Sequence, residues 1–362
     1  KVGMNGYYVQ FFTPHTFFER WYAHRDNPTL RPEPLSNGDV QGMLRSLVDE
    51  IKLRGLLYHA VGHGWTCEPF GVPGESWEKN EEELPEAARR AFAEVNGVRE
   101  LWHGVALNTN LCYSKDWVRA TVNNAIADYC EKNPAVDYVH FWLADGTNNH
   151  CECPDCRETR PADYYVKMLN ELDEMMTARS IPTKVVFLIY VDLLWEPEHE
   201  KIKNPDRFTL MFAPITRTYS KAFTDFDRSA VPELAPYERN RLTMPKSVEE
   251  NIARLSRWQA MFPGDSFDFD YHFMWDHFKD PGYYSMAKVL TEDMKGLKSI
   301  GINGMVSCQN QRVYLPTGLG MHMMAAALWD NTVDFDTESA AYFAAAFGEG
   351  AADALAYCKT LS

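Results

Sequence analysis

Seven short apolar or aromatic runs alternate with helix-like segments along most of the chain, and this alternation limits the possible folds more than any other feature. The runs cover residues 6–12, 56–65, 137–145, 183–192, 207–215, 266–273 and 302–309. Near-continuous apolar strands separated by helices are typical of a parallel sheet with helices on its outer face. The sequence therefore predicts an α/β fold.

The segments between these runs carry apolar residues at helical spacing. We expect helices over residues 38–55, 115–133, 162–180, 247–262 and 285–301. The first of them ends at Gly55, which is a common stop signal for a helix. Residues 72–90 are rich in charge and break the rhythm, so a long loop with a short helix is expected there.

This order of elements predicts a (β/α)8 TIM barrel that lacks its first strand in this chain. Seven runs are one short of eight, and the chain opens on the first run without an initiator Met, so we expect the natural polypeptide to begin earlier. We place the barrel at residues 1–330 and a C-terminal helical segment, packed on it or following it, at 331–362. A doubly wound open sheet is the alternative, but no G-x-G-x-x-G or Walker loop follows any strand.

Composition narrows the expected partners and compartment. The 362 residues carry a formal net charge of −15, which argues against nucleic acid as a partner because phosphate binding needs clustered Lys and Arg. No run approaches the roughly 18 apolar residues of a membrane span, so we expect no membrane partner. Eight cysteines are too sparse for a disulfide scaffold, and we expect a reducing, cytoplasmic location.

Acids, aromatic rings and amides collect where the predicted strands end, which is where barrel enzymes of this type place their chemistry. We predict Asp145 as a general acid, Asp270 as the second carboxylate and Asp192 as its reserve. Residues that bind hydroxyls or stack on sugar rings are predicted at His63, Trp65, Asn148, Tyr190, Trp195, Arg217, Tyr271, His272 and Asn310.

Each of these residues also has a simpler interpretation. Asp145-Gly146 is a common turn dipeptide, and His63 between two glycines could be a structural histidine. Asp268, Asp270 and His272 share one strand face, which could point outward. Arg217 could pair with a neighbouring carboxylate instead of a substrate.

Three cysteines lie within six positions of one another in "HCECPDC", shortly after Asp145. Thiolates at Cys151, Cys153 and Cys156 could occupy three corners of a structural zinc tetrahedron. We predict Cys67 as the fourth ligand, because it follows the preceding strand, with Cys112 and His150 as alternatives. Such an ion would fasten two long loops together beside Asp145.

Two stretches carry a family resemblance. "GDVQGMLRSLVDEIKLRGLLYHAVGHGW", followed by "YVHFWLADGTNNHCECPDC", resembles the bacterial family known as domain of unknown function 4838, and "LWDNTVDFDTESAAYFAAAFGEGA" resembles its closing segment. That family is similar to glycoside hydrolases, in particular to the barrels of family 20 hexosaminidases and family 67 α-glucuronidases. Family 20 enzymes end a strand in Asp-Glu, whereas "LADG" here offers Asp145 alone. The α-glucuronidase likeness implies a lone acid on that strand, and Arg217 could then meet a uronate.

Together these observations predict an exo-acting glycoside hydrolase that cleaves a carbohydrate, such as a hexosaminide or a uronide, by carboxylate acid/base catalysis. Two alternatives stay open. One is a zinc-dependent hydrolase or deacetylase in which the thiolate cluster is catalytic. The other is a carbohydrate-binding barrel without catalysis. Neither the sugar nor the oligomeric state can be deduced from the sequence.

Overall fold

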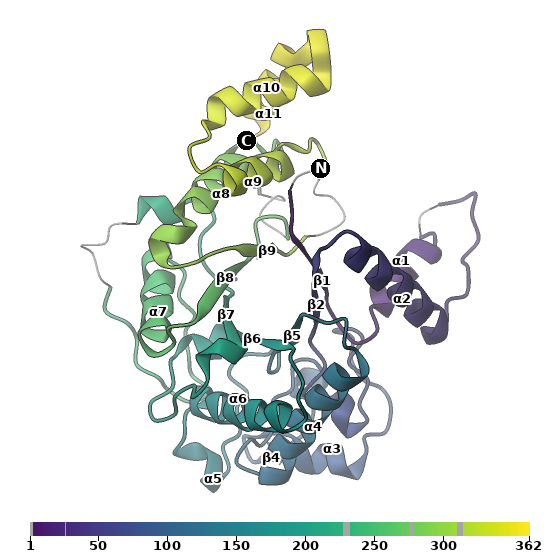
Figure 1. Ribbon diagram of the computed structural model, residues 1–362, viewed down its shortest axis with the longest axis vertical. Coiled ribbons are helices and arrows are strands. Elements are labelled where there is room, and N and C mark those ends of the chain that lie inside the picture. The colour runs from purple at the N-terminus through teal and green to yellow at the C-terminus, as the bar shows by residue number, and fades with distance from the viewer. Residues whose placement is uncertain (1–2, 26, 227–231, 275–278, 310–313) are drawn as a thin grey trace.

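Seven parallel strands form one sheet that curves almost into a closed barrel (Figure 1). The computed structural model describes residues 3–25, 27–226, 232–274, 279–309 and 314–362. The strands follow one another around the sheet in chain order: β1 Gly6–Val9, β2 Leu57–Gly62, β5 Tyr138–Phe141, β6 Lys184–Ile189, β7 Phe208–Phe212, β8 Asp265–Asp270 and β9 Met305–Ser307. Each strand lies within one of the seven predicted runs or within a residue of it, and the predicted α/β barrel fold is confirmed.

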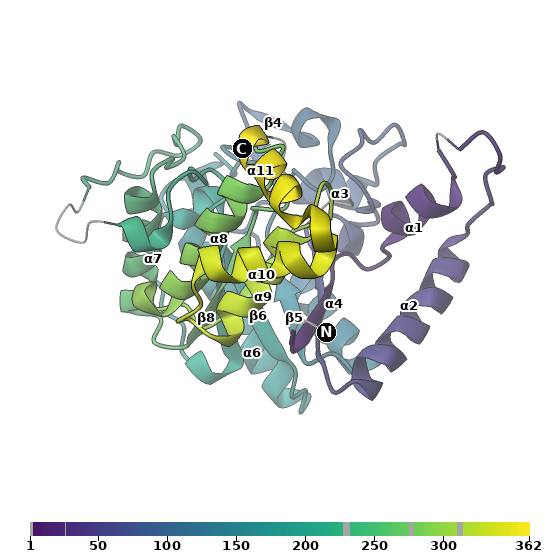
Figure 2. The same ribbon diagram turned by 90° about the horizontal axis from the view of Figure 1, so that it is seen from above.

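Helices cover the outer face of the sheet, as the alternation predicted. The helices that contribute to the core on this face include α2 Asn37–Leu53, α3 Glu86–Ala91, α4 Asp116–Lys132, α6 Pro161–Ala178, α7 Val248–Met261 and α8 Tyr284–Gly296. Helix α1 His15–Tyr22 and the short α5 Pro154–Arg157 lie in the connections between strands. Ser36 caps α2 and Ser247 caps α7, each in a reciprocal capping box that satisfies backbone N–H groups at the helix start. In Figure 2, α1 and α2 stand to one side of the barrel and α7 to the other.

Two parts of the chain depart from simple β/α alternation. The connection from β6 to β7 contains only short 3-10 turns, at Val191–Leu194 and Pro205–Arg207. The connection from β2 to β5 is long and carries a small antiparallel hairpin, β3 Glu94–Val95 and β4 Val98–Arg99, before α4 begins. After β9, helices α9 Leu319–Trp329, α10 Phe335–Phe347 and α11 Ala351–Leu361 pack with α8 around Phe335 and Phe343.

Side chains alternate between two apolar layers because successive residues of a strand point to opposite faces. On β5, Val139 and Phe141 pack in the large outer core between sheet and helices. Trp142, just beyond the same strand, packs inside the barrel with Val186 and Met211 of the neighbouring strands. Both faces of the sheet are therefore buried, which explains why the strands are apolar along their whole length.

Neutral histidines fill the middle of the barrel. His59 Nδ1 lies 2.9 Å from His140 Nε2, and the Tyr8 ring stacks on His140 with centroids 4.3 Å apart. Burial lowers the pKa of His59 to about 4 and that of His140 well below its usual range. This uncharged layer closes the barrel beneath its carboxyl end.

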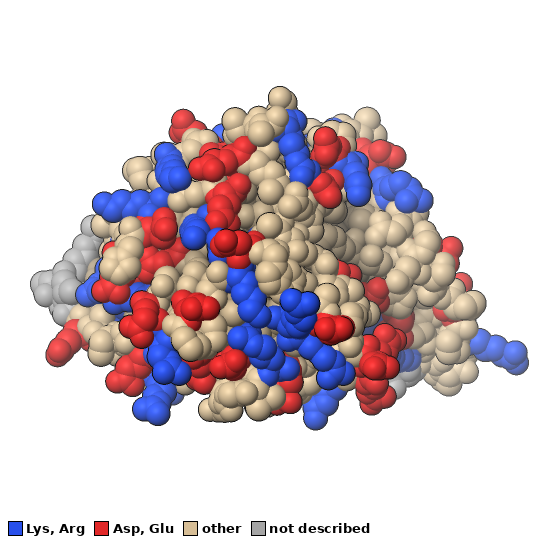
Figure 3. All heavy atoms as spheres, turned by 90° about the horizontal axis from the view of Figure 1, so that it is seen from below, with Lys and Arg blue, Asp and Glu red and all other residues tan. Residues whose placement is uncertain are grey.

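Charged side chains on the face shown in Figure 3 are mixed, with Lys and Arg lying among Asp and Glu. No helix in the described ranges is long and apolar enough to cross a membrane.

Candidate active site at the carboxyl end of the barrel

Asp145 lies at the carboxyl end of the barrel, four residues after β5. Its backbone N–H donates to the carbonyl of Leu107 at 2.8 Å, and its Oδ2 accepts a hydrogen bond from Trp77 Nε1 at 2.7 Å. The carboxylate is half-buried and also interacts with the side chain of Tyr190. Loops from both sides therefore hold this acid, and part of its side chain stays open to solvent.

Aromatic rings surround Asp145. Phe11 stacks on His63 with centroids 5.6 Å apart, and Trp77 meets these two rings edge-on at 5.5 and 5.2 Å. Trp142 meets His63 edge-on at 4.7 Å. Burial lowers the pKa of His63, although the charge of Asp145 opposes this shift, so His63 is neutral at pH 7. We call Asp145 and these four rings the mouth site.

Tyr190, Tyr271 and Cys308 lie beside the mouth site, inside the barrel. Burial raises the pKa of both tyrosines, and the nearby charge of Asp145 raises it further. Burial also raises the pKa of the Cys308 thiol to about 12, with added contributions from the charges of Asp270 and Asp145. At neutral pH these three groups are uncharged, so Asp145 faces polar but neutral neighbours.

Asp192 is buried behind the loop that follows Asp145. Its two carboxylate oxygens lie 2.9 and 3.2 Å from the backbone N–H of Asn148, and burial raises its pKa to about 6. Asn148 has a left-handed backbone, with φ of 53°, and its side-chain amide bonds to the backbone of Leu242 in both directions. A cavity of about 10 Å³, lined in part by Tyr190 and Asp192, has room for roughly one water molecule. Asn148 and Asp192 thus fix the shape of this loop.

Asp270 belongs to a different arrangement. Phe267, Phe269 and Tyr271 pack inside the barrel, whereas Asp268, Asp270 and His272 take the opposite face. One Asp270 oxygen lies 2.5 Å from His272 Nδ1, and the other accepts the His272 backbone N–H at 3.1 Å. His272 is fully buried, and its Nε2 lies 3.3 Å from Asp293 Oδ2 of α8 without hydrogen-bond alignment. The strand face therefore directs Asp270 and His272 away from the mouth site.

Arg217 supplies the positive charge of this arrangement. Its Nη2 donates to Asp293 Oδ2 at 2.9 Å, both side chains are almost fully enclosed, and the guanidinium lies 3.9 Å from the ring centroid of Phe223. The prediction that Arg217 binds substrate is wrong in this geometry, because a buried carboxylate already occupies it. We call Arg217, Asp268, Asp270, His272 and Asp293 the sealed network.

Trp65 and Trp195 do not line a sugar subsite, contrary to the prediction. Both pack in the outer core between sheet and helices. Trp65 Nε1 donates to the carbonyl of His140 at 2.7 Å, and Trp195 Nε1 donates to the carbonyl of Ala235 at 3.0 Å. Their N–H groups are satisfied by backbone, as buried indoles require.

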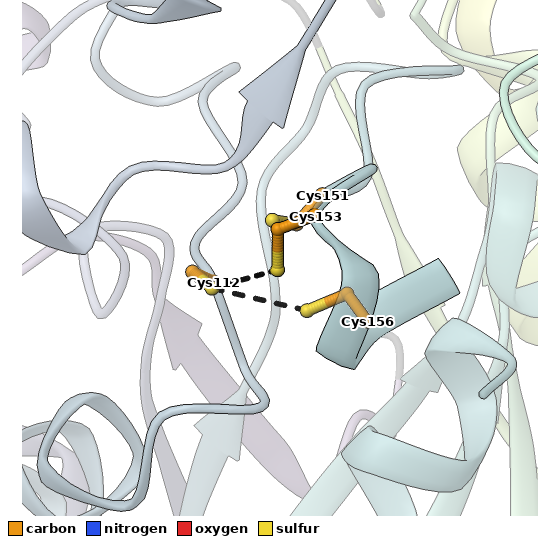
Figure 4. A group of neighbouring side chains, drawn as sticks. All are labelled: Cys112, Cys151, Cys153 and Cys156. Carbon is orange, nitrogen blue, oxygen red and sulfur yellow. Dashed lines mark hydrogen bonds between the residues drawn. The ribbon is translucent and has the colours of Figure 1, made fainter. Parts of the chain in front are cut away.

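The cysteine cluster forms, but with a different fourth member. The Sγ atoms of Cys112, Cys151, Cys153 and Cys156 all lie within 4.8 Å of one another, and all four residues are buried (Figure 4). The prediction of Cys67 is wrong: its thiol donates to the carbonyl of Gly64 at 3.4 Å within the outer core. The long β2–β5 connection passes Cys67 early, and only its later part lies beside the β5–α6 loop, where the Glu152 N–H donates to the Glu94 carbonyl.

His150 is also outside this cluster. Its backbone N–H donates to Asn240 Oδ1 at 2.8 Å, and burial lowers the pKa of its ring to about 3.

A set of four mutually close thiols leaves no open coordination position, which disfavours a catalytic metal at this cluster.

Comparison with known protein families identifies the family of this chain. Residues 78–359 match the family described as Domain of unknown function (DUF4838). The chain belongs to this family. No curated protein matches the chain.

Among solved structures, the DUF4838 chain is similar to a native Bacteroidetes-affiliated GH5 cellulase linked with a polysaccharide utilization locus. The identity is 10%, the TM-score is 0.46, and the match covers 93% of this chain and 87% of the other. It is also similar to a GH36 α-galactosidase, AgaA, from Geobacillus stearothermophilus in complex with 1-deoxygalactonojirimycin. There the identity is 12%, the TM-score is 0.41, and the match covers 91% of this chain and 38% of the other. The likeness to family 20 and family 67 barrels stays a prediction.

Some residues of this candidate site were not found from the sequence. Trp77 lies in the charged segment 72–90, and only the fold brings it to Asp145. Trp142 was detectable, because it shares strand parity with His140 and directly precedes the "LAD" stretch. Asp293 lies on a helix and carries no sequence signal. Asn310, predicted to bind substrate, lies outside the described residues.

Proposed function

We propose that this protein hydrolyses glycosidic bonds at the mouth site, with Asp145 as the group that protonates the leaving oxygen. One observation carries the proposal: a half-buried carboxylate lies among aromatic rings at the carboxyl end of a parallel barrel. Barrel enzymes place their chemistry at this end. Flat rings beside a hydrogen-bonding acid suit a pyranose, which offers apolar faces and hydroxyl edges.

The contacts of Asp145 suit an acid that must keep one orientation. Trp77 holds Oδ2 through its indole N–H, and the backbone bond to Leu107 fixes the start of the loop. In the proposed step, the glycosidic C–O bond breaks and the leaving oxygen takes the proton of Asp145. Water adds to the anomeric carbon, and the proton that this water loses returns to the Asp145 carboxylate through solvent, which restores the acid. Tyr190 stays protonated and can donate to a sugar hydroxyl or to Asp145.

Most glycoside hydrolases use a second carboxyl group as base or nucleophile. Asp270 is turned into the sealed network, so it does not suit this role in the described geometry. Asp192 lies nearer to the mouth site, because its charge and that of Asp145 both raise the pKa of Tyr190. We assign Asp192 a positioning role through the Asn148 N–H, and chemical rescue of an Asp192→Gly variant by azide would instead identify it as the second carboxylate.

A carbohydrate-binding barrel without catalysis is the second candidate. The observation that favours it is the burial of Asp270, which leaves Asp145 without the partner that the sequence suggested. The mouth site could then hold a sugar on its rings without cleaving it.

A panel of aryl glycosides that includes hexosaminides and uronides separates the two candidates. We expect release of the aryl group from at least one member by the wild type and none above background by Asp145→Asn, with unchanged melting temperature. Sugar binding in calorimetry with no cleavage of any glycoside would favour the second candidate. Equal turnover by wild type and Asp145→Asn would remove Asp145 from the acid role.

A further inference from the structure

We propose that Cys112, Cys151, Cys153 and Cys156 bind one zinc ion that fastens the β2–β5 connection to the β5–α6 loop. Cys112 Sγ lies 3.7 Å from Cys153 Sγ and 3.8 Å from Cys156 Sγ. Zinc–sulfur bonds of about 2.3 Å in a regular tetrahedron place the sulfurs about 3.8 Å apart. These two distances match a tetrathiolate site, and all four sulfurs lie within 4.8 Å of one another.

Local backbone structure directs the sulfurs toward one point. Cys153 immediately precedes the short helix α5, and the Cys156 N–H donates to the Cys153 carbonyl at 3.0 Å, so a single turn places both thiols on one side (Figure 4). Cys151 enters from the preceding loop, and Cys112 enters from the far connection. All four side chains converge, although they come from segments about 40 residues apart in sequence.

Donors outside the cluster are placed as a charged metal–thiolate group requires. The Glu94 backbone N–H lies 3.3 Å from Cys151 Sγ, and Arg99 Nη1 lies 3.9 Å from the same sulfur. Arg239 donates to the carbonyls of Cys151 at 3.0 Å and Cys156 at 2.7 Å. Such outer contacts orient ligands and offset the negative charge that four thiolates leave around a divalent ion.

Disulfide bonding and plain apolar packing of thiols account for the cluster less well than a metal does. All eight cysteines are free, and sulfurs 3.7–3.8 Å apart are far from the roughly 2.05 Å of a disulfide. Apolar packing would not need three cysteines in six positions joined by a fourth from another loop. Iron also accepts four thiolates in a tetrahedron, so the metal must be identified by measurement.

The proposed ion would stabilise the two loops that frame Asp145. Next to the cluster, the Glu152 N–H donates to the Glu94 carbonyl at 2.7 Å. Asn149 then bonds both to Asn110 and to the carbonyl of Asn108, which continues the contact toward Asp145. A Cβ at Gly146 would collide with the Asn108 carbonyl, so the two loops touch through their backbones. The ion is thus a positioning element and takes no part in the chemistry.

Metal analysis of the full chain, purified without a metal-affinity step, tests the proposal. We expect about one zinc per chain in the wild type, with Cys112→Ser and Cys156→Ser reduced at least about tenfold in zinc content. Cys67→Ser is the matched control and should keep its zinc, because a serine hydroxyl can still donate to the Gly64 carbonyl. Equal zinc in Cys112→Ser and Cys67→Ser would overturn the assignment.

Reconstitution keeps the proposal testable if the site variants fail to fold. Unfolded, chelated wild type should recover its native circular dichroism with added Zn²⁺ and show tetrahedral tetrathiolate bands with Co²⁺ in its place. Iron in place of zinc, disulfides among the four cysteines, or metal-free chain that refolds to the same melting temperature with and without Zn²⁺ would each contradict the proposed zinc site.

Discussion

The mouth site and the sealed network lie at the same end of the barrel and are built from similar residues, yet they differ in access. Asp145 is only half-buried and lies among rings, whereas Asp268, Asp270 and Asp293 are at most 2% exposed and share Arg217 and His272. The difference arises from strand face. A side chain that points inward reaches the open end of the barrel, and one that points outward is covered by α8. Acids at strand ends are therefore candidates for catalysis only when they point inward.

The sealed network also shows how burial is compensated. Burial raises the pKa of Asp268 well above its usual range, the charge of Asp270 adds to this, and Arg217 opposes it. Asp268 Oδ1 is buried without a hydrogen-bond partner among the described residues, which fits a carboxyl group that stays protonated. Burial likewise raises the pKa of Asp293, while Arg217 and His272 lower it. The positive charge of Arg217 thus offsets part of the burial cost of both Asp268 and Asp293.

Paired substitutions at Asp145 and Asp270 should separate the two regions most clearly. We expect Asp145→Asn to lower kcat by about 10²–10⁴-fold, which is typical of a lost general acid, with little change in stability. Asp270→Asn should instead lower the melting temperature and leave kcat of the folded fraction within about threefold of wild type. Steady-state kinetics on the best aryl glycoside, together with thermal unfolding, measure both. The opposite pattern would place Asp270 in the catalytic machinery.

Removal of the arginine should break the sealed network. Arg217→Met leaves buried carboxylates without their cation, and loss of one partner of a buried pair costs about 3–5 kcal/mol of the free energy of unfolding. Urea unfolding at pH 7 gives this value. The double variant Arg217→Met/Asp293→Leu should recover part of the loss, since it also removes the uncompensated charge. Additive losses in the double variant would mean that the two side chains do not interact.

The pH dependence of stability should report the raised pKa of Asp192. Because the pKa of Asp192 is about 6 in the folded protein and near 3.8 when unfolded, its contribution to stability is full below about pH 4 and is lost as pH rises through 6. Relative to wild type, Asp192→Asn should therefore gain up to about 3 kcal/mol in the free energy of unfolding between pH 4 and pH 7. Asn keeps an oxygen for the Asn148 N–H, so comparison across pH isolates the charge. A pH-independent difference would contradict the raised pKa.

The smallest effect is expected from the indole that orients Asp145. Trp77→Phe keeps the ring near Phe11 and His63 but removes the 2.7 Å hydrogen bond. Because Trp77 is 46% exposed, we expect a loss of about 1 kcal/mol, or roughly fivefold in kcat/KM, with unchanged stability. An unchanged kcat/KM would show that Trp77 contributes contact area only.

Much of the fold could be predicted because strand and helix periodicity are local properties. All seven strands and the five predicted helices form where the apolar pattern placed them, and the clustered cysteines Cys151, Cys153 and Cys156 do meet. The site was predicted less well. Asp145, His63 and Tyr190 come together at the mouth, but Trp65 and Trp195 pack in the outer core. Both positions follow strand ends, where a change of backbone direction decides which layer a side chain enters.

The sequence by itself determined the alternating strands and helices, the parallel α/β class and the three-cysteine loop, since each depends on spacing between near neighbours. Only the tertiary structure decided that Asp270 faces α8, that Trp77 reaches Asp145 across 68 residues, and that Cys112 joins the cluster in place of Cys67. The physical reason is that both faces of β8 are buried at its carboxyl end. Periodicity shows which residues share a face, but when both faces are buried it cannot show which one looks into the barrel.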